Sequence, residues 1–152
     1  MTIECRLSGL KRHDLSTLGG TTSVKGLLRR AVRATLAAED VPDAEISVTL
    51  LDDAAIAGLN EQYLSHAGPT DVLSFPLWSE GETPVGEVCI GFHYAVRQAA
   101  ELGVAATEEL VRLAVHGTLH VLGHSHPEGE SRMESMMWAL QERIVSEVVS
   151  GG

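Results

Sequence analysis

An eleven-residue segment near the end of the chain, residues 116–126 (HGTLHVLGHSH), holds four of the seven histidines. His116 and His120 stand at i and i+4, so on a helix their imidazoles leave the same face one turn apart. Gly123 suits the left-handed conformation that ends a helix, after which the chain turns back. His126 then follows where it can join the first two. The segment therefore predicts a helix, a glycine end and a turn.

The trio His116, His120 and His126 predicts a zinc site with one Zn²⁺ per chain. Three neutral imidazoles without a thiolate suit zinc, and three protein ligands leave a fourth position for water, which is typical of catalytic sites. His124 is not assigned, because on a continued helix it would lie about 12 Å from His116, too far for two bonds of about 2 Å. The remaining histidines are interpreted as ordinary polar residues; they are His13, His66 and His93.

The histidine spacing matches the metzincin protease pattern H-E-x-x-H-x-x-G-x-x-H at every defined position except one, where the glutamate is Gly117 here. In those proteases the glutamate is the general base that takes a proton from water, and glycine has no group that does so. A zinc metallopeptidase is therefore the least favoured hypothesis for this chain.

With glycine at that place, the segment resembles the signature of the YbeY family, H-G-x-L-H-L-x-G-Y-D-H. Three further stretches follow the order of that family's N-x-x-Y, T-D-V-L-S-F-P and G-D-I-x-I motifs; they are residues 60–63 (NEQY), 70–76 (TDVLSFP) and 86–90 (GEVCI). The resemblance covers roughly residues 45–145. It implies an α+β fold with a small mixed sheet flanked by helices.

The resemblance also implies a function. Members of the family are zinc-dependent, single-strand-specific endoribonucleases of ribosomal RNA maturation, so the expected activity is 16S rRNA 3′ end processing, with a role in ribosome quality control. The expected partners are ribosomal RNA and the small ribosomal subunit, with a small-subunit protein and an assembly GTPase.

Three departures from the family pattern bear on chemistry. The family has an arginine directly after the tyrosine and an aspartate three positions later, where this chain has Leu64 and Ala67. That arginine is the residue most often held to act on RNA, so its loss favours an alternative, a ribosome-assembly binding protein with weak or lost nuclease activity. After Gly123 the family's Tyr-Asp is also missing. Asp71 or Glu128 is a candidate for the carboxylate that would accept a hydrogen bond from a metal-binding histidine and so orient it.

The net charge of −10 is unusual for a protein that acts on RNA. Nucleic-acid binders draw much of their affinity from Lys and Arg that neutralise phosphates, so any attraction here has to be local. Lys25, Arg29 and Arg33 fall at i, i+4 and i+8 of a predicted helix and form one basic stripe, which is a candidate RNA contact. The alternative interpretation is a solvated helix face, with RNA met already bound in a ribosomal particle.

Length and composition indicate a single domain over residues 1–152, with enough chain to bury one core. Cys5 and Cys89 are the only cysteines, which excludes a disulfide scaffold and a thiolate zinc site. The start of the sequence lacks a basic region leading into an apolar stretch, and no run of about 18 apolar residues occurs. We therefore expect a cytoplasmic protein with no membrane segment.

Hydrophobic periodicity predicts four strands, at residues 3–7, 46–50, 72–75 and 85–90. It predicts helices that end near residue 38 and residue 63, and helices at about residues 93–102, 107–122 and 127–149. We expect Thr21, Thr22 or Ser23 to cap the first helix and Asp52 or Asp53 to cap the second. We also expect Pro76 to stop the third strand and Trp138 to pack the last helix onto the body.

Overall fold

Strands and helices follow one another in the order that the hydrophobic pattern predicts. A computed structural model describes residues 1–123 and 131–151, with only the backbone for residues 131–134. The strands are β1 (Thr2–Ser8), β2 (Glu45–Leu51), β3 (Val72–Pro76) and β4 (Val85–Gly91). The helices are α1 (Arg12–Ser16), α2 (Thr21–Ala38), α3 (Asp53–Leu64), α4 (Phe92–Leu102), α5 (Ala106–Val121) and α6 (Ser131–Ser150). The short α1 is an addition that the pattern does not predict.

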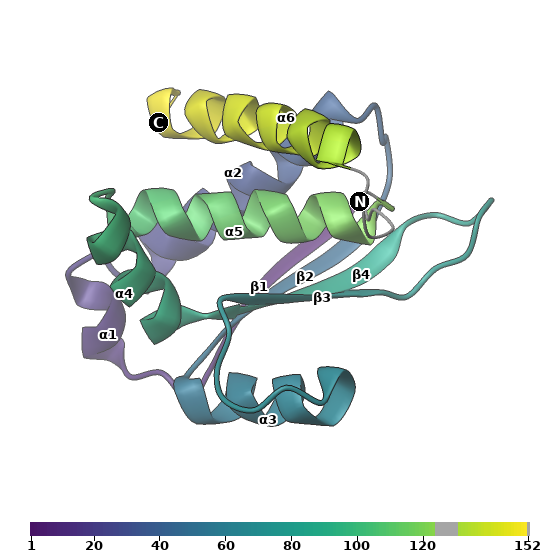
Figure 1. Ribbon diagram of the computed structural model, residues 1–152. Coiled ribbons are helices and arrows are strands. Elements are labelled where there is room, and N and C mark those ends of the chain that lie inside the picture. The colour runs from purple at the N-terminus through teal and green to yellow at the C-terminus, as the bar shows by residue number, and fades with distance from the viewer. Residues whose placement is uncertain (124–130, 152) are drawn as a thin grey trace.

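The described strands form one mixed sheet of four, in the order β1-β2-β4-β3. β1, β2 and β4 run parallel, whereas β3 pairs antiparallel with β4 and forms one edge. Figure 1 shows α2, α5 and α6 above the sheet and α3 below it. The expected α+β fold, a small mixed sheet flanked by helices, is confirmed.

Apolar residues cover both faces of the sheet. On the face toward α2 and α5, the central strand β2 contributes Ile46, Val48 and Leu50, each at most 1% exposed. On the opposite face, Leu51, Leu73 and Cys89 pack with Ile56 of α3 in a smaller cluster. None of the helices in the described ranges has the length and hydropathy that a bilayer-spanning segment requires.

The helix starts differ in how well the sequence predicts them. Asp52 caps α3 as expected, since its Oδ1 accepts a hydrogen bond of 2.9 Å from the backbone N–H of Ala55. The cap expected for α2 is wrong, because Thr21, Thr22 and Ser23 lie inside the helix and Gly20 stands at the N-cap without a side-chain bond. Gly20 has a φ of 94°, a conformation that glycine adopts freely, so the turn ends and the helix begins directly after it.

β3 ends at Pro76, so the prediction that Pro76 stops this strand is confirmed, although Pro76 itself is the last residue of the strand. Leu77 donates to Val85 and Gly91 donates to Asp71, so the odd-numbered residues of β3 make the hydrogen bonds to β4. Pro76 pairs with Gly86 between two such positions. Because no N–H is needed there, the edge strand tolerates proline.

Trp138 does not pack α6 onto the body, contrary to the prediction, since it is 59% exposed. Its neighbour Met137 is 6% exposed and Ile144 is fully buried, and these two belong to the main core. The large ring therefore stands on the outer side of the helix, one position away from the buried stripe.

Two glycines let α5 approach the sheet closely. A Cβ at Gly117 of α5 would collide with Cγ1 of Val88 in β4 and would lie 3.1 Å from the Ser74 hydroxyl of β3. A Cβ at Gly86 of β4 would lie 2.7 Å from Cγ2 of Val121, near the end of α5. The helix is thus held against β4 and β3 along its last turn, from Gly117 to Val121.

The first prediction tests this close approach. Gly117→Ala should lower the free energy of unfolding by about 1–2 kcal/mol, because overpacking of about 1–3 kcal/mol outweighs the helix propensity that alanine adds. Gly26 in α2 and Gly58 in α3 are matched controls, since nothing lies within 4 Å of a Cβ built on either. Alanine at each control should stabilise by about 0.5–1 kcal/mol. Denaturant unfolding measures all three, and a gain at position 117 equal to the controls would contradict the packing argument.

Candidate metal centre

Helix α5 carries His116 and His120 on one face, as their spacing predicts. Their Nε2 atoms lie 3.0 Å apart, and the ring centroids are separated by 4.5 Å at an interplanar angle of 65°. Both side chains are half-buried. Two imidazole nitrogens that converge in this way can bind a single metal ion.

The end of α5 has the predicted glycine turn. Gly123 adopts a φ of 103°, and its N–H donates a hydrogen bond of 3.0 Å to the carbonyl of His120. The indole Nε1–H of Trp78 donates to the carbonyl of Val121 at 2.7 Å, which ties the loop after β3 to the helix end. These contacts direct the chain out of the helix directly after the histidine pair.

The proposed third ligand His126, the unassigned His124 and the candidate carboxylate of Glu128 all lie outside the described residues. Within the described ranges, no group of three or more His, Cys, Asp or Glu side chains converges on one point. The structure therefore brings two of the three predicted ligands together, and the assignment of all three as zinc ligands stays a prediction.

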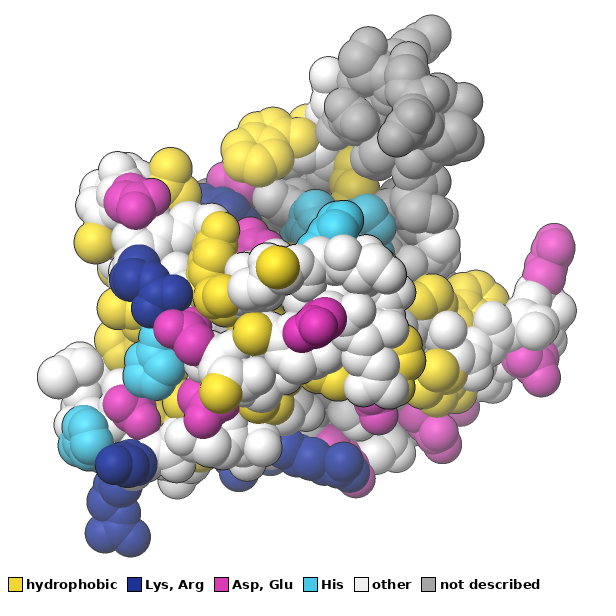
Figure 2. All heavy atoms as spheres, turned by 60° about the horizontal axis from the view of Figure 1, so that its bottom comes forward, with side chains coloured by type: hydrophobic (Ala, Val, Ile, Leu, Met, Phe, Trp, Pro, Cys, Tyr) yellow, Lys and Arg dark blue, Asp and Glu magenta, His cyan; other side chains and the backbone are white. Residues whose placement is uncertain are grey.

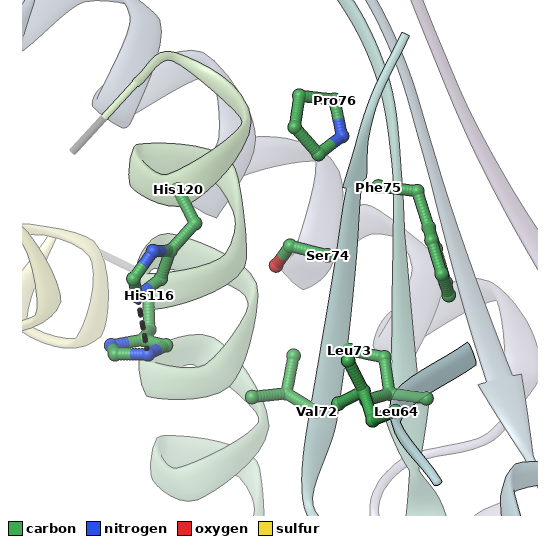
Figure 3. Close-up of a pocket in the computed structure, with 8 residues that line it drawn as sticks. All are labelled: Leu64, Val72, Leu73, Ser74, Phe75, Pro76, His116 and His120. Atoms are coloured by element: carbon green, nitrogen blue, oxygen red, sulfur yellow. Dashed lines mark hydrogen bonds between the residues drawn. The ribbon is translucent and has the colours of Figure 1, made fainter. Parts of the chain in front are cut away.

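The two histidines line a pocket between α5 and the edge strand β3. Its volume is about 320 Å³, and Figure 3 shows Ser74 projecting from β3 toward the histidines; the described lining residues are Leu64, Val72, Leu73, Ser74, Phe75, Pro76, His116 and His120. Figure 2 shows histidine side chains open to solvent in a hollow of this face. Among the lining residues that the structure describes there is no lysine or arginine, so this wall offers no fixed positive charge.

Leu64, the position of the family's arginine, lies at this pocket and is 50% exposed. Leu64 is the last residue of α3, and Ser65 ends the helix in the left-handed conformation. The neighbouring Tyr63 packs edge-on against Phe75 of β3, with ring centroids 5.2 Å apart. This contact holds the end of α3 beside β3, so the side chain at position 64 faces the site.

Gln141 of α6 is a site residue that the sequence argument missed. Its Oε1 lies 2.7 Å from Nδ1 of His116, and its side chain is 2% exposed. The only sequence signal is a polar residue inside the buried stripe of a helix, between Met137 and Ile144. The partner, 25 positions away, becomes visible only when α6 packs on α5.

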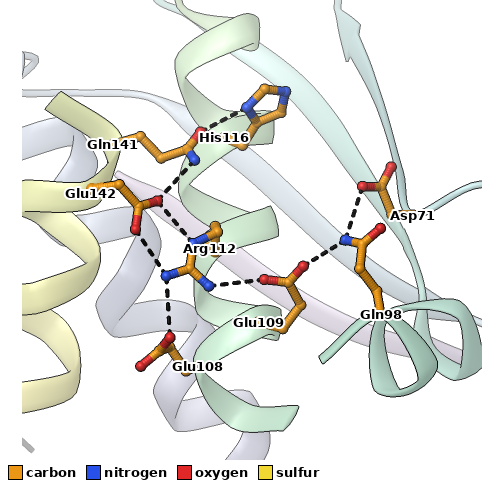
Figure 4. A network of polar contacts seen from close by, with 8 residues as sticks. All are labelled: Asp71, Gln98, Glu108, Glu109, Arg112, His116, Gln141 and Glu142. Atoms are coloured by element: carbon orange, nitrogen blue, oxygen red, sulfur yellow. Dashed lines mark hydrogen bonds and ion pairs between the residues drawn. The ribbon is translucent and has the colours of Figure 1, made fainter. Parts of the chain in front are cut away.

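A single guanidinium links three carboxylates, and Gln141 bonds to one of them (Figure 4). Arg112 binds both oxygens of Glu142, at 2.8 and 2.9 Å, and also contacts Glu109 at 2.9 Å and Glu108 at 3.2 Å. Gln141 donates from Nε2 to Glu142 at 3.2 Å. Arg112 is thus the positive centre of a cluster that joins α5 to α6.

This pairing shifts the pKa of both main partners. Hydrogen bonds that Arg112 donates to Glu142 raise the pKa of the guanidinium above its usual value, and the same bonds hold the pKa of the Glu142 carboxyl below its usual value. The pKa of Glu142 is lower in the folded state than in the unfolded state. The ion pair of Glu142 therefore stabilises the fold at pH values above the unfolded-state pKa, and this stabilisation is lost as the pH falls through the folded-state pKa.

Asp71 lies at the other end of the same network. Its Oδ2 accepts from Gln98 at 3.3 Å, its Oδ1 accepts from the backbone N–H of Val72 at 2.8 Å, and Gln98 also donates to Glu109 at 2.5 Å. The direct contact with His116 comes from Gln141, so the network separates Asp71 from that histidine by several side chains.

The basic stripe is placed away from the pocket. Lys25, Arg29 and Arg33 lie on α2, as predicted, and the carbonyl of Lys25 accepts from Sγ of Cys5 in β1 at 3.6 Å. β1 and β3 are opposite edges of the sheet. The stripe and the histidine pair are therefore not brought together.

Comparison with known proteins agrees with this geometry. The profile of the Endoribonuclease YbeY family matches residues 12–149. Endoribonuclease YbeY of Persephonella marina is 37% identical over 140 residues, covering 88% of this chain and 89% of that protein. Endoribonuclease YbeY of Moorella thermoacetica is 42% identical over 133 residues, covering 80% and 84%.

The fold is also that of a solved structure. The solution structure of TM1509 from Thermotoga maritima matches with a TM-score of 0.64 and 27% identity, and the match covers 99% of this chain and 91% of that one. The profile match over nearly the whole length and the curated relatives at 37% and 42% identity lead to one conclusion. The chain belongs to the Endoribonuclease YbeY family.

Proposed function

We propose that this chain is a zinc-dependent endoribonuclease that cleaves single-stranded RNA during ribosomal RNA maturation. The observation that supports it most directly is the pair of Nε2 atoms of His116 and His120, 3.0 Å apart at the wall of a pocket beside the edge strand β3. Relatives that carry the name Endoribonuclease YbeY supply the reaction class.

The finer assignments are part of the same proposal. Residues 1–152 act as a single domain in the cytoplasm. The substrate is ribosomal RNA in the small subunit, at the 3′ end of 16S rRNA, and the activity contributes to ribosome quality control. A small-subunit protein and an assembly GTPase are the proposed protein partners.

The residues present fit a zinc ion. His116 and His120 would bind it through Nε2, because the carbonyl oxygen of Gln141 occupies the Nδ1 side of His116, and His126 would be the third ligand. When bound, zinc supplies Lewis-acid chemistry that neutralises charge developing on a phosphodiester. The protein itself orients the imidazoles, and Ser74 presents a hydroxyl to the same pocket.

Two alternative functions are a ribosome-assembly binding protein and a metallopeptidase, and different residues bear on each. A ribosome-assembly binding protein with weak or lost cleavage is favoured by Leu64, which places an apolar side chain where the family pattern has a cation. A metallopeptidase is disfavoured, because a glutamate at position 117 would collide with Val88. Incubation of one purified preparation with structured RNA and with casein, with and without a chelator, separates the three.

The second prediction concerns the ligands. His120→Ala should reduce zinc from one ion per chain to nearly none, because two imidazoles and water hold zinc poorly. His13→Ala is the control, since the His13 side chain is 76% exposed, and it should leave the zinc content unchanged. Elemental analysis of the dialysed proteins measures this. Full zinc in His120→Ala, or a loss in His124→Ala and not in His126→Ala, would overturn the ligand assignment.

The third prediction concerns Leu64. Leu64→Arg should raise single-turnover cleavage of single-stranded RNA by at least about tenfold, because a guanidinium at the pocket can bind a phosphate with two parallel hydrogen bonds. Leu77→Arg is the matched control. Leu77 is 58% exposed and lines a different hollow, so this variant changes the net charge equally without changing the histidine pocket.

Equal gains in the two arginine variants would assign the effect to net charge and contradict the role of position 64. Brisk cleavage by the natural chain with no gain in Leu64→Arg would show that another residue supplies the charge. No cleavage by any variant, with RNA still bound, would favour the assembly-protein alternative.

The fourth prediction concerns the basic stripe, which we propose as a phosphate contact remote from the pocket. Replacement of Lys25, Arg29 and Arg33 by Ala should weaken RNA binding and flatten its dependence on salt, because fewer counterions are released. Zinc content should not change, since α2 does not carry the predicted ligands. Binding titrations at several salt concentrations measure the slopes, and identical slopes would identify the stripe as a solvated face.

A further inference from the structure

Gln141 stands out among the buried polar side chains because it contacts a predicted metal ligand. It projects from α6 toward α5, is 2% exposed, and places Oε1 at 2.7 Å from Nδ1 of His116. The neighbouring buried positions of α6, Met137 and Ile144, are apolar and belong to the main core. An amide in such surroundings needs partners for both ends, since an unpaired buried polar group costs about 1–3 kcal/mol.

The orientation of this amide follows from its other contact. Its Nε2 lies 3.2 Å from Oε2 of Glu142, a carboxylate that only accepts hydrogen bonds. Both oxygens of Glu142 are in turn held by Arg112. The NH₂ end of Gln141 therefore faces Glu142, and the carbonyl end faces His116.

The amide orientation determines the tautomer of His116. A carbonyl oxygen only accepts, so the proton between Gln141 and His116 belongs to Nδ1 of the imidazole. Nε2 of His116 then carries the lone pair, and it is this atom that lies 3.0 Å from Nε2 of His120. The ring thus presents its metal-binding nitrogen on the side where the second histidine converges.

We propose that Gln141 is a positioning residue that holds His116 as the Nδ1-protonated tautomer, with Nε2 directed to the metal position. This inference rests on the proposed zinc site. A neutral acceptor also suits the local charge, because Arg112 already serves three carboxylates, and a fourth beside Glu142 would add like-charge repulsion. Arg112 and Glu142 act behind Gln141 by fixing the direction of its amide.

Gln141→Leu removes the acceptor while keeping a side chain of similar size, and Gln141→Met repeats the test with an unbranched chain. Gln98→Leu is the matched control, since Gln98 belongs to the same network but bonds to Asp71 and Glu109 and, among the described residues, does not bond to His116. Gln141→Glu is the conservative variant, because a carboxylate also accepts from Nδ1–H.

The first measurement is the histidine tautomer, read from long-range ¹H–¹⁵N correlation spectra of the full chain without metal and with one equivalent of zinc. We expect a proton on Nδ1 of His116 in the natural chain, in Gln98→Leu and in Gln141→Glu. We expect Gln141→Leu and Gln141→Met to give a mixture of tautomers without metal. A merely structural role of Gln141 would leave the tautomer unchanged.

The second measurement is the zinc dissociation constant, obtained by competition with a chelator. Loss of such a partner typically weakens metal binding about 10–100-fold, so we expect that loss in Gln141→Leu and Gln141→Met and less than about threefold in Gln98→Leu. A proton on Nε2 of His116 in the natural chain would overturn the inference. An unchanged tautomer of His116 and an unchanged zinc affinity in both Gln141→Leu and Gln141→Met would also overturn it. A natural chain that binds no zinc but has the Nδ1 proton would overturn the zinc site and support the positioning contact.

Discussion

The close contact between α5 and the sheet is the constraint on which the rest of the structure depends. Gly117 of α5 lies against the side chain of Val88, and Gly86 of β4 lies against the side chain of Val121, so at each point only one of the two facing residues has a side chain between the helix and the strand. The histidine pair can therefore approach the edge strand β3 closely enough to share a pocket with Ser74. The same contact explains why the protease glutamate is incompatible with this fold, since position 117 faces the sheet.

The second constraint is electrostatic and acts behind the histidines. The side chain of Glu109 is 2% exposed and that of Arg112 is 16% exposed, so each needs a partner of opposite charge. Arg112 contacts Glu142 on α6, and Glu109 receives a bond from Gln98 on α4, which joins three helices around one guanidinium. Because the Arg112–Glu142 contact fixes the position of α6, it also places Gln141, the residue before Glu142, in contact with His116. The packing of α6 on α5 and the orientation of the His116 imidazole thus depend on the same set of contacts.

Leu64 contributes to the lining of the histidine pocket more than to the packing of α3. At the exposed end of α3, leucine and arginine can both be accommodated, because Tyr63 makes the packing contact with Phe75 and position 64 faces the pocket. A leucine there leaves the described wall of the pocket without a fixed positive charge in a chain of net charge −10. If the chain acts on RNA as proposed, the attraction has to come from outside this wall, for example from remote basic residues or from a particle that already holds the RNA.

Local patterns were sufficient where neighbours along the chain decide the outcome. The i and i+4 histidines, the glycine end at Gly123, the Asp52 cap and the strand order along the chain all follow from short-range geometry. The sequence by itself therefore determined the elements other than the short α1, the α+β class and the face shared by His116 and His120. The predicted ligand His126 lies outside the described residues and stays a prediction. Only tertiary packing decided that Gln141 meets His116, that Pro76 fits an edge position, that Trp138 faces outward and that the basic stripe lies near β1, the sheet edge opposite β3. These outcomes depend on which elements lie side by side. The local spacing of residues in the sequence does not indicate how close two different elements lie in the fold.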